Sequence, residues 1–118
     1  AVGGVPPEVM GIGPAPAIQR LLQGAGLSMD DVARFEINEA QGAQTLAVSR
    51  ALNLPQDRLN VHGGAIALGH PLAATGVRLT ITVSRQLQAI GARWGVASAC
   101  IGGGQGIALL IENPGAAS

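Results

Sequence analysis

The sequence has 118 residues, 47% of them hydrophobic and only 2% aromatic, which allows one domain with a modest core of small aliphatic side chains. Seven basic and seven acidic residues give a formal net charge of zero, which argues against a dedicated nucleic-acid surface, and no apolar run reaches the roughly 20 residues that cross a bilayer. The single cysteine excludes an internal disulfide and predicts a reducing, cytoplasmic setting. The low charged fraction of 12% predicts that another domain or subunit covers part of the surface.

The first half of the sequence is divided by Gly and Pro, which separate two helices and a strand. Prolines suit the first turn of a helix, glycines suit its end, and a Ser-Met-Asp-Asp segment has the pattern of a capping box. In chain order we predict an extended loop over residues 1–13, a helix from Pro14 that ends at Gly24 or Gly26, a helical turn at residues 28–31, a strand at residues 34–37 and a helix from Asn38 to about Leu52.

The second half predicts the longest helix and a terminal hairpin. In chain order we predict a short strand at residues 59–61, a helix over residues 73–90 that Gly91 ends, a buried strand at residues 94–101, a glycine turn at residues 102–104, a partner strand at residues 105–112 and a loose tail at residues 113–118. Arg78 and Arg85 are expected to lie in solvent. One face of the long helix is expected to be partly apolar; its residues are Val77, Thr80, Ile81, Ser84, Leu87 and Gln88.

Helices alternate with strands along the chain until the final hairpin. This order predicts an α/β fold in one domain over residues 1–118, with a mixed, mostly parallel sheet and helices on both faces. In such sheets, ligands bind beyond the carboxyl ends of the strands. Asn38, the loop that carries His70, and Cys100 each lie at or after a predicted strand end, so we expect them to form one site.

The two histidines stand in different contexts. His70 follows a glycine-rich segment and precedes Pro71, so backbone and substrate can approach closely to an imidazole that acts as acid or base. A structural or surface role is the alternative for His70. For His62, which directly follows a predicted strand, the structural role is the favoured one. No carboxylate or cysteine lies near the two at ligand spacing, so we expect no metal site.

Two further polar groups are candidates for the same site. Cys100 ends a strand and precedes three glycines, beginning with Gly102, whose N–H groups can stabilise a thiolate or an oxyanion; the alternative is an inert buried cysteine. Asn38 can cap the helix that follows it and can also hold a water molecule. The Gly-Gly-Gly-Gln-Gly segment links two strands and lacks the spacing of a dinucleotide or Walker motif, which excludes a Rossmann or P-loop site.

Four segments together resemble the C-terminal half of the thiolases, the acetyl-CoA acetyltransferases and 3-ketoacyl-CoA thiolases. They occur in the family's order and spacing, and the similarity runs along nearly all of the chain. The resemblance implies one half of a five-layer α-β-α-β-α fold, in which the helix at residues 73–90 is a candidate for the layer shared between the halves. The matching segments are Met10-Gly11-Ile12-Gly13-Pro14, Asn38-Glu39-Ala40, residues 63–71, and Cys100-Ile101-Gly102-Gly103-Gly104.

The resemblance also implies a role for each site residue. His70 would activate a nucleophilic cysteine and help to bind the thioester oxygen, and Asn38 would hold the water that completes this oxyanion hole. Cys100 would move a proton at the α-carbon of the acyl group, and the N–H of Gly102 would contribute to a second oxyanion hole. Coenzyme A would be a substrate, no cofactor would be tightly bound, and the setting would be fatty acid metabolism.

The departures from the family pattern leave two functions open. Thiolases carry the acyl group on a cysteine of their N-terminal half, whereas the only cysteine here, Cys100, matches the acid/base position. We therefore expect an acyltransferase part that is inactive alone and works with an N-terminal half, on the same or a separate chain, in a homo-oligomer without nucleic-acid or membrane partners. Gln41 and Gly42 stand where Phe-Ala is usual, and Ala73 and Thr75 stand where Gly and Ser are usual. The amide of Gln41 supports the alternative, a non-catalytic thiolase-derived module that binds acyl-CoA or assembles with partners.

Overall fold

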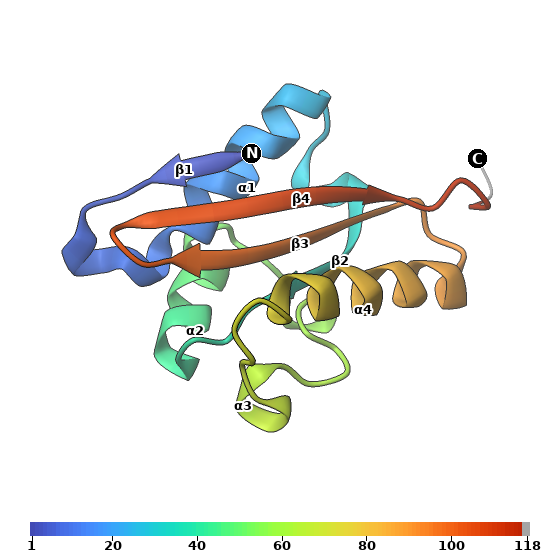
Figure 1. Cartoon of the computed structure of the whole chain (residues 1–118). Coiled ribbons are helices and arrows are strands. Elements are labelled where there is room, and N and C mark those ends of the chain that lie inside the picture. The colour runs from blue at the N-terminus through green and yellow to red at the C-terminus, as the bar shows by residue number, and fades with distance from the viewer. Residues whose placement is uncertain (117–118) are drawn as a thin grey trace.

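The structure, a computed structural model, describes residues 1–116 as one sheet with helices against it (Figure 1). Short 3₁₀-helices occur at Pro7–Ile12, Met29–Asp31 and Gln56–Arg58. Within the described residues, no helix is long and apolar enough to cross a membrane. In chain order the other elements are β1 (Val2–Gly4), α1 (Pro14–Ala25), β2 (Val32–Ile37), α2 (Gly42–Ala51), α3 (Ala65–Leu68), α4 (Thr75–Ile90), β3 (Trp94–Ile101) and β4 (Gln105–Glu112).

The strands form one sheet in the order β1-β4-β3-β2. β2 runs parallel to β3, whereas β4 is antiparallel to both of its neighbours. The predicted α/β class with a mixed sheet and helices on both faces is therefore confirmed, but parallel pairs do not predominate. That expectation depended on a strand at residues 59–61, which does not form. Leu59 makes only an isolated bridge to Phe35, and Asn60 then turns the backbone with a φ of 47°.

Each face of the sheet has its own apolar core. On one face, α1 and α2 pack around Ile18, Phe35 and Val48, all of which have no exposed surface. On the other face, α4 places Leu79 and Leu87 against the strands. Figure 1 shows α4 running along β2 and β3, away from α1. Because full burial of such a side chain is worth about 1.5–3 kcal/mol, these two clusters fix the helices on the sheet.

The helix expected to begin at Asn38 begins later along the chain. α2 starts at Gly42, and Gln41 rather than Asn38 occupies its N-cap. Asn38 still belongs to the sheet, since its N–H donates to the Ser98 carbonyl oxygen on β3 at 2.9 Å. The side chain of Gln41 is exposed, so the amide that replaces the usual Phe lies outside the core.

Only part of the face expected on α4 packs against the sheet, since Leu87 is buried there as expected. Val77 and Ile81 are 60% and 48% exposed, whereas Leu79 and Val83 are buried against the sheet. Arg78 was expected in solvent but turns toward the sheet. Aliphatic side chains occur on both sides of α4, so burial of one side leaves an apolar stripe that residues 1–116 do not cover.

The ends of the elements agree with the predictions in part. Gly26 after α1 and Gly91 after α4 both have a φ of 67°, in the left-handed region that ends helices. The loop expected over residues 1–13 instead contains β1 and a 3₁₀-helix. The expected loose tail begins with an anchored residue. The N–H of Asn113 donates to the carbonyl oxygen of Arg93, just before β3, at 2.8 Å. Residues 117–118 of that tail lie outside the described residues.

Candidate functional site

Asn38 and Cys100 lie where adjacent parallel strands end. β2 pairs with β3 so that Ile37 is opposite Ser98, and the next residue, Asn38, donates its N–H to the Ser98 carbonyl oxygen. Cys100 follows Ser98 by two positions on β3. Both strands run in the same direction, so the structure brings the two polar residues to the same carboxyl edge of the sheet, where ligands of such sheets bind.

The side chain of Asn38 is buried with an unsatisfied oxygen. Asn38 is 2% exposed, and no group of residues 1–116 donates a hydrogen bond to its Oδ1. A buried amide oxygen without a donor costs about 1–3 kcal/mol. Such groups are rare unless a water molecule or a ligand supplies the missing hydrogen bond, so the side chain is suited to hold a small polar molecule.

Cys100 is half-buried and keeps its proton. Burial raises the pKa of the Cys100 thiol, with a weaker opposing effect from a backbone hydrogen bond. Reactive cysteine nucleophiles have the opposite property, a lowered pKa. Cys100 pairs with Gly106 on β4, and a Cβ atom at Gly106 would collide with the backbone of Gly13. The strand pair that carries Cys100 is therefore packed closely against the start of α1, and a thiol that is protonated at neutral pH is suited to donate or recover a proton.

His70 lies exposed in the loop between α3 and α4, with one ring nitrogen anchored. Its Nδ1 is 2.7 Å from Oγ1 of Thr75, and this hydroxyl also lies 3.2 Å from the carbonyl oxygen of Pro71. The hydroxyl has a single hydrogen, which the Pro71 carbonyl can accept, so the oxygen is able to accept from an Nδ1–H group. This arrangement favours the tautomer in which Nε2 is unprotonated and acts as a base.

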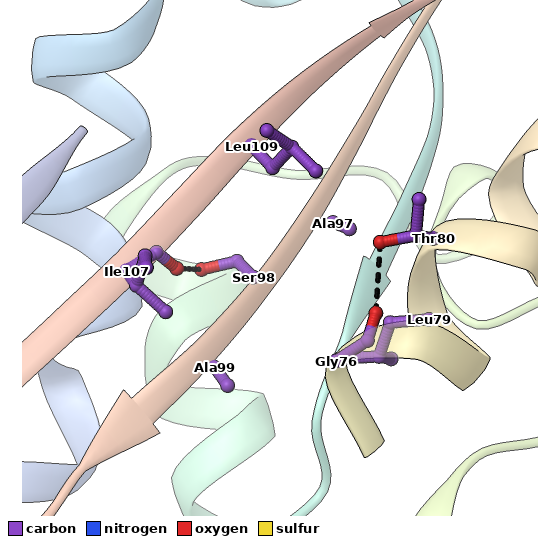
Figure 2. A pocket seen from close by; sticks show the side chains of 8 residues that line it. All are labelled: Gly76, Leu79, Thr80, Ala97, Ser98, Ala99, Ile107 and Leu109. Atoms are coloured by element: carbon purple, nitrogen blue, oxygen red, sulfur yellow. Dashed lines mark hydrogen bonds between the residues drawn. The ribbon is translucent and has the colours of Figure 1, made fainter. Parts of the chain in front are cut away.

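The first turn of α4, whose Thr75 anchors His70, lies near the carboxyl end of β3. Gly76 directly follows Thr75, and both Gly76 and Ala99 line a hollow of 280 Å³ between α4 and the sheet (Figure 2). Gly102 lies exposed in the turn between β3 and β4. Within residues 1–116, no hydrogen bond joins the side chains of Asn38, His70 and Cys100. The complete lining of the hollow is Gly76, Leu79, Thr80, Ala97, Ser98, Ala99, Ile107 and Leu109.

A buried polar cluster beneath the site was not predicted from the sequence. Glu36, with no exposed surface, accepts hydrogen bonds from Nη1 of Arg78 at 3.2 Å and from Nε2 of Gln86 at 2.9 Å. Burial raises the pKa of the Glu36 carboxyl, against the opposing effects of Gln86 and Arg78. His62 is exposed, with Nδ1 at 3.4 Å from Nε2 of Gln86. Among the residues described, no three His, Cys, Asp or Glu side chains gather as a metal site would require.

Comparison with known proteins finds matches along nearly all of the chain. A family model described as "Thiolase, C-terminal domain" matches residues 1–113. The chain is 51% identical to the 3-ketoacyl-CoA thiolase of Bacillus subtilis (strain 168) and 53% identical to the acetyl-CoA acetyltransferase of Escherichia coli (strain K12), each over 112 residues. These matches cover 95% of the chain but only 29% and 28% of the two relatives.

Solved structures agree with the sequence comparison. The acetyl-CoA acetyltransferase of Bacillus anthracis aligns with a TM-score of 0.92 at 47% identity. Human mitochondrial 3-ketoacyl-CoA thiolase, also solved in complex with CoA, aligns with a TM-score of 0.93 at 52% identity. Each match covers 95% of this chain and 28% of the other chain, so the similarity concerns a little more than a quarter of the solved enzymes.

Proposed function

The chain belongs to the thiolase family, in which it corresponds to the C-terminal domain of these acyltransferases, and we propose that it supplies the C-terminal catalytic half of an enzyme that condenses acyl-CoA thioesters or cleaves 3-ketoacyl-CoA with coenzyme A. The observation that supports the proposal is the position of Asn38 and Cys100 at the carboxyl ends of two adjacent parallel strands, with His70 in the loop that leads into the first turn of α4. Each has the property its step requires: an unsatisfied buried amide oxygen, a ring with one nitrogen anchored, and a thiol that retains its proton.

In the cleavage direction the first step needs a cysteine from the N-terminal half. His70 Nε2 takes the proton of that thiol, and the resulting thiolate attacks the 3-keto carbon of the substrate. The bond between C2 and C3 then breaks, which leaves the acyl group on the cysteine and an enolate on the departing acetyl-CoA. The Sγ–H of Cys100 protonates C2 of this enolate. A raised thiol pKa suits this step, because the proton is still on sulfur at neutral pH.

The second step returns every group to its first state. The thiol of coenzyme A passes its proton to the Cys100 thiolate and attacks the acyl group, which leaves the N-terminal cysteine as a thiolate. The His70 imidazolium then returns the first proton to it. Negative charge on the thioester oxygen is stabilised by the protonated Nε2 of His70 and by a water molecule that Asn38 holds, and the N–H of Gly102 serves the other carbonyl oxygen.

Coenzyme A is the proposed co-substrate. A structure of human mitochondrial 3-ketoacyl-CoA thiolase, 52% identical to this chain, was solved in complex with CoA. No tightly bound cofactor is proposed, because the two proton carriers and the oxyanion donors account for each step. The proposed setting is fatty acid metabolism in the cytoplasm, although several of the relatives are mitochondrial enzymes.

The proposed partner is an N-terminal thiolase half that carries the nucleophile, on the same or a separate chain, within a homo-oligomer. An uncovered apolar surface supports it. Val77 and Ile81 of α4 and Ile107 and Leu109 of β4 are 44–60% exposed, and the hollow in Figure 2 lies between these elements. Such surface is costly in water and is typical of a face that another domain covers. Because the only cysteine, Cys100, has the acid/base role, the chain alone is expected to have no turnover.

The alternative function is a non-catalytic module that binds acyl-CoA or assembles with partners. Its support is Gln41, which presents an exposed amide where the family has Phe. Replacing Cys100 with serine separates the two functions in an enzyme assembled from this chain and an N-terminal half. The catalytic role predicts that turnover falls by at least about a hundredfold, the usual contribution of one general acid–base group. A non-catalytic module has no turnover, so Cys100→Ser should leave its acyl-CoA affinity unchanged.

A further inference from the structure

Asn60 holds the residues on both sides of Asn38. Its Oδ1 accepts the N–H of Ile37 at 2.9 Å, and its Nδ2 donates to the carbonyl oxygen of Ile37 at 2.9 Å. The same Nδ2 lies 3.2 Å from Oε1 of Glu39. The backbone N–H of Asn60 donates to the carbonyl oxygen of Phe35 at 2.9 Å. A single side-chain amide thus replaces the missing strand beside the end of β2 and fixes the segment that carries Asn38.

Glu39 extends this contact to the loop that carries His70. Its Oε2 accepts the N–H of Ile66 in the first turn of α3 at 3.0 Å. A Cβ atom at Gly64 would push the Glu39 carboxyl group away, so glycine there allows the close approach. α3 ends at Leu68, and the next residue, Gly69, has a φ of 91° and leads directly into His70.

Apolar packing does little to hold α3. Ile66 and Leu68 are 70% and 63% exposed, and Ala65 is its only buried residue. The hydrogen bond from Ile66 to Glu39 therefore gives this short helix a direct polar connection to the end of β2. On the other side of His70, the loop is held by the contact of its ring with Thr75.

We propose that Asn60 and Glu39 are positioning residues that set the separation between Asn38 and His70. The proposal rests on the proposed function, in which those two residues bind one thioester oxygen, directly and through a water molecule. Neither Asn60 nor Glu39 touches the reacting atoms. Both act through geometry, and a displacement of about 1 Å at a catalytic group can lower a rate about a hundredfold.

Two nearly isosteric substitutions test the network. In Asn60→Asp, an oxygen replaces Nδ2 and faces two acceptors, the Ile37 carbonyl and the Glu39 carboxylate. In Glu39→Gln, one of the two carboxylate oxygens becomes an NH₂ group that faces a donor. In the double variant the new amide NH₂ can donate to the new carboxylate, so the contact between positions 39 and 60 returns with its polarity reversed. Asp57→Asn, at an exposed acid outside the network, is the matched control.

The first measurement is amide hydrogen exchange of the 118-residue chain itself. We expect exchange over residues 65–70 to accelerate at least about tenfold in Asn60→Asp and Glu39→Gln, since loss of a charge-assisted hydrogen bond is worth at least that factor. Exchange in β3 should stay unchanged. Asp57→Asn should match the unmodified chain. Unchanged exchange over residues 65–70 in Glu39→Gln would overturn the proposal, even if Asn60→Asp failed to fold.

The second measurement is thiolysis of acetoacetyl-CoA by the enzyme assembled with an N-terminal half. We expect each single variant to lower kcat at least about tenfold with KM changed by less than about threefold, because the geometry of the oxyanion site changes and not substrate binding. The double variant should recover part of the loss relative to Asn60→Asp. Equal kcat in all variants would overturn the positioning role. If the unmodified assembly had no turnover, the proposed function would fail, while hydrogen exchange would still decide whether Asn60 and Glu39 hold the His70 loop.

Discussion

The ring of His70 is anchored by the hydroxyl of Thr75, with 2.7 Å between Nδ1 and Oγ1. Thr75 is buried in the first turn of α4, so the rigid helix fixes the orientation of an otherwise exposed ring. A base whose second nitrogen is held in this way keeps one tautomer and one direction of approach. The finding connects the longest helix of the fold directly to the proposed chemistry.

Removal of the Thr75 hydroxyl should therefore impair catalysis more than folding. Thr75→Val preserves side-chain shape but removes the oxygen that accepts from Nδ1–H. In the assembled enzyme we expect kcat for acetoacetyl-CoA thiolysis to fall about ten- to a hundredfold, the range lost when a general base is misoriented. Thr75→Ser retains the hydroxyl and should keep activity within about threefold of the unmodified enzyme. Equal activity of the Val and Ser variants would show that the anchor is unimportant.

The titration of Cys100 can be followed in the isolated chain, because it is the only cysteine. Burial raises the pKa of its thiol, and only the thiolate reacts with iodoacetamide. We expect the alkylation rate to rise with pH to a midpoint above the roughly 8.5 of an unperturbed cysteine. At pH 7.5, Cys100 should react more slowly than free glutathione. A midpoint below that of glutathione would contradict the proposed role as a proton donor and favour a nucleophile.

The loop after His70 contains a strained residue. Ala73 has a φ of 65°, in the left-handed region, which costs a residue with a side chain roughly 1–2 kcal/mol. Ala73→Gly should raise the free energy of unfolding by about 0.5–1 kcal/mol, since the greater chain entropy of glycine offsets part of the relief. Ala74→Gly, at a φ of −103°, is the control and should not stabilise. Urea unfolding of both variants measures the difference, and a destabilised Ala73→Gly would disprove the strain.

The uncovered apolar face should bind the N-terminal half. Ile107 is 44% exposed at the edge of the hollow in Figure 2, whereas Ile90 is 47% exposed in the last turn of α4. Ile107→Lys should weaken association of separately produced halves at least about tenfold, because it buries a charge in an apolar interface. Titration calorimetry measures the affinity.

Ile90→Lys provides the matched control for the same change in charge and volume. It should alter the affinity by less than about threefold, and both variants should unfold within about 0.5 kcal/mol of the unmodified chain, as exposed substitutions usually do. Equal weakening by the two substitutions would show that the surface around Ile107 is not the interface.

The sequence predicted the elements whose ends carry a local signal. The left-handed glycines after α1 and α4 and the glycine turn between β3 and β4 are such signals. The strand expected at residues 59–61 does not form because Asn60 pairs with β2 by its backbone only at Phe35 and by its side chain at Ile37. Alternation of β-formers cannot distinguish these two solutions, since both leave the same backbone groups of β2 paired.

The predicted face of α4 was only partly correct, for another reason. Val77 and Ile81 are as apolar as Leu79 and Val83, so hydrophobic period alone could not select the side that packs on this sheet. The motifs around Asn38, His70 and Cys100 could be recognised because each lies at or just after the end of an element. Thr75, Glu39 and Asn60 were not assigned roles, because their contacts depend on how loops meet in space.

The most direct test of the proposed function is turnover by a chimaera. Residues 1–113 of this chain would replace the matching C-terminal segment of the Bacillus subtilis 3-ketoacyl-CoA thiolase, to which it is 51% identical. Thiolysis of acetoacetyl-CoA is followed by loss of its absorbance, beside the isolated chain and the Cys100→Ser chimaera. The account predicts turnover by the chimaera, none by the isolated chain, and a loss of at least about a hundredfold in Cys100→Ser. A folded chimaera that binds CoA but has no turnover would contradict the catalytic role and favour the binding module.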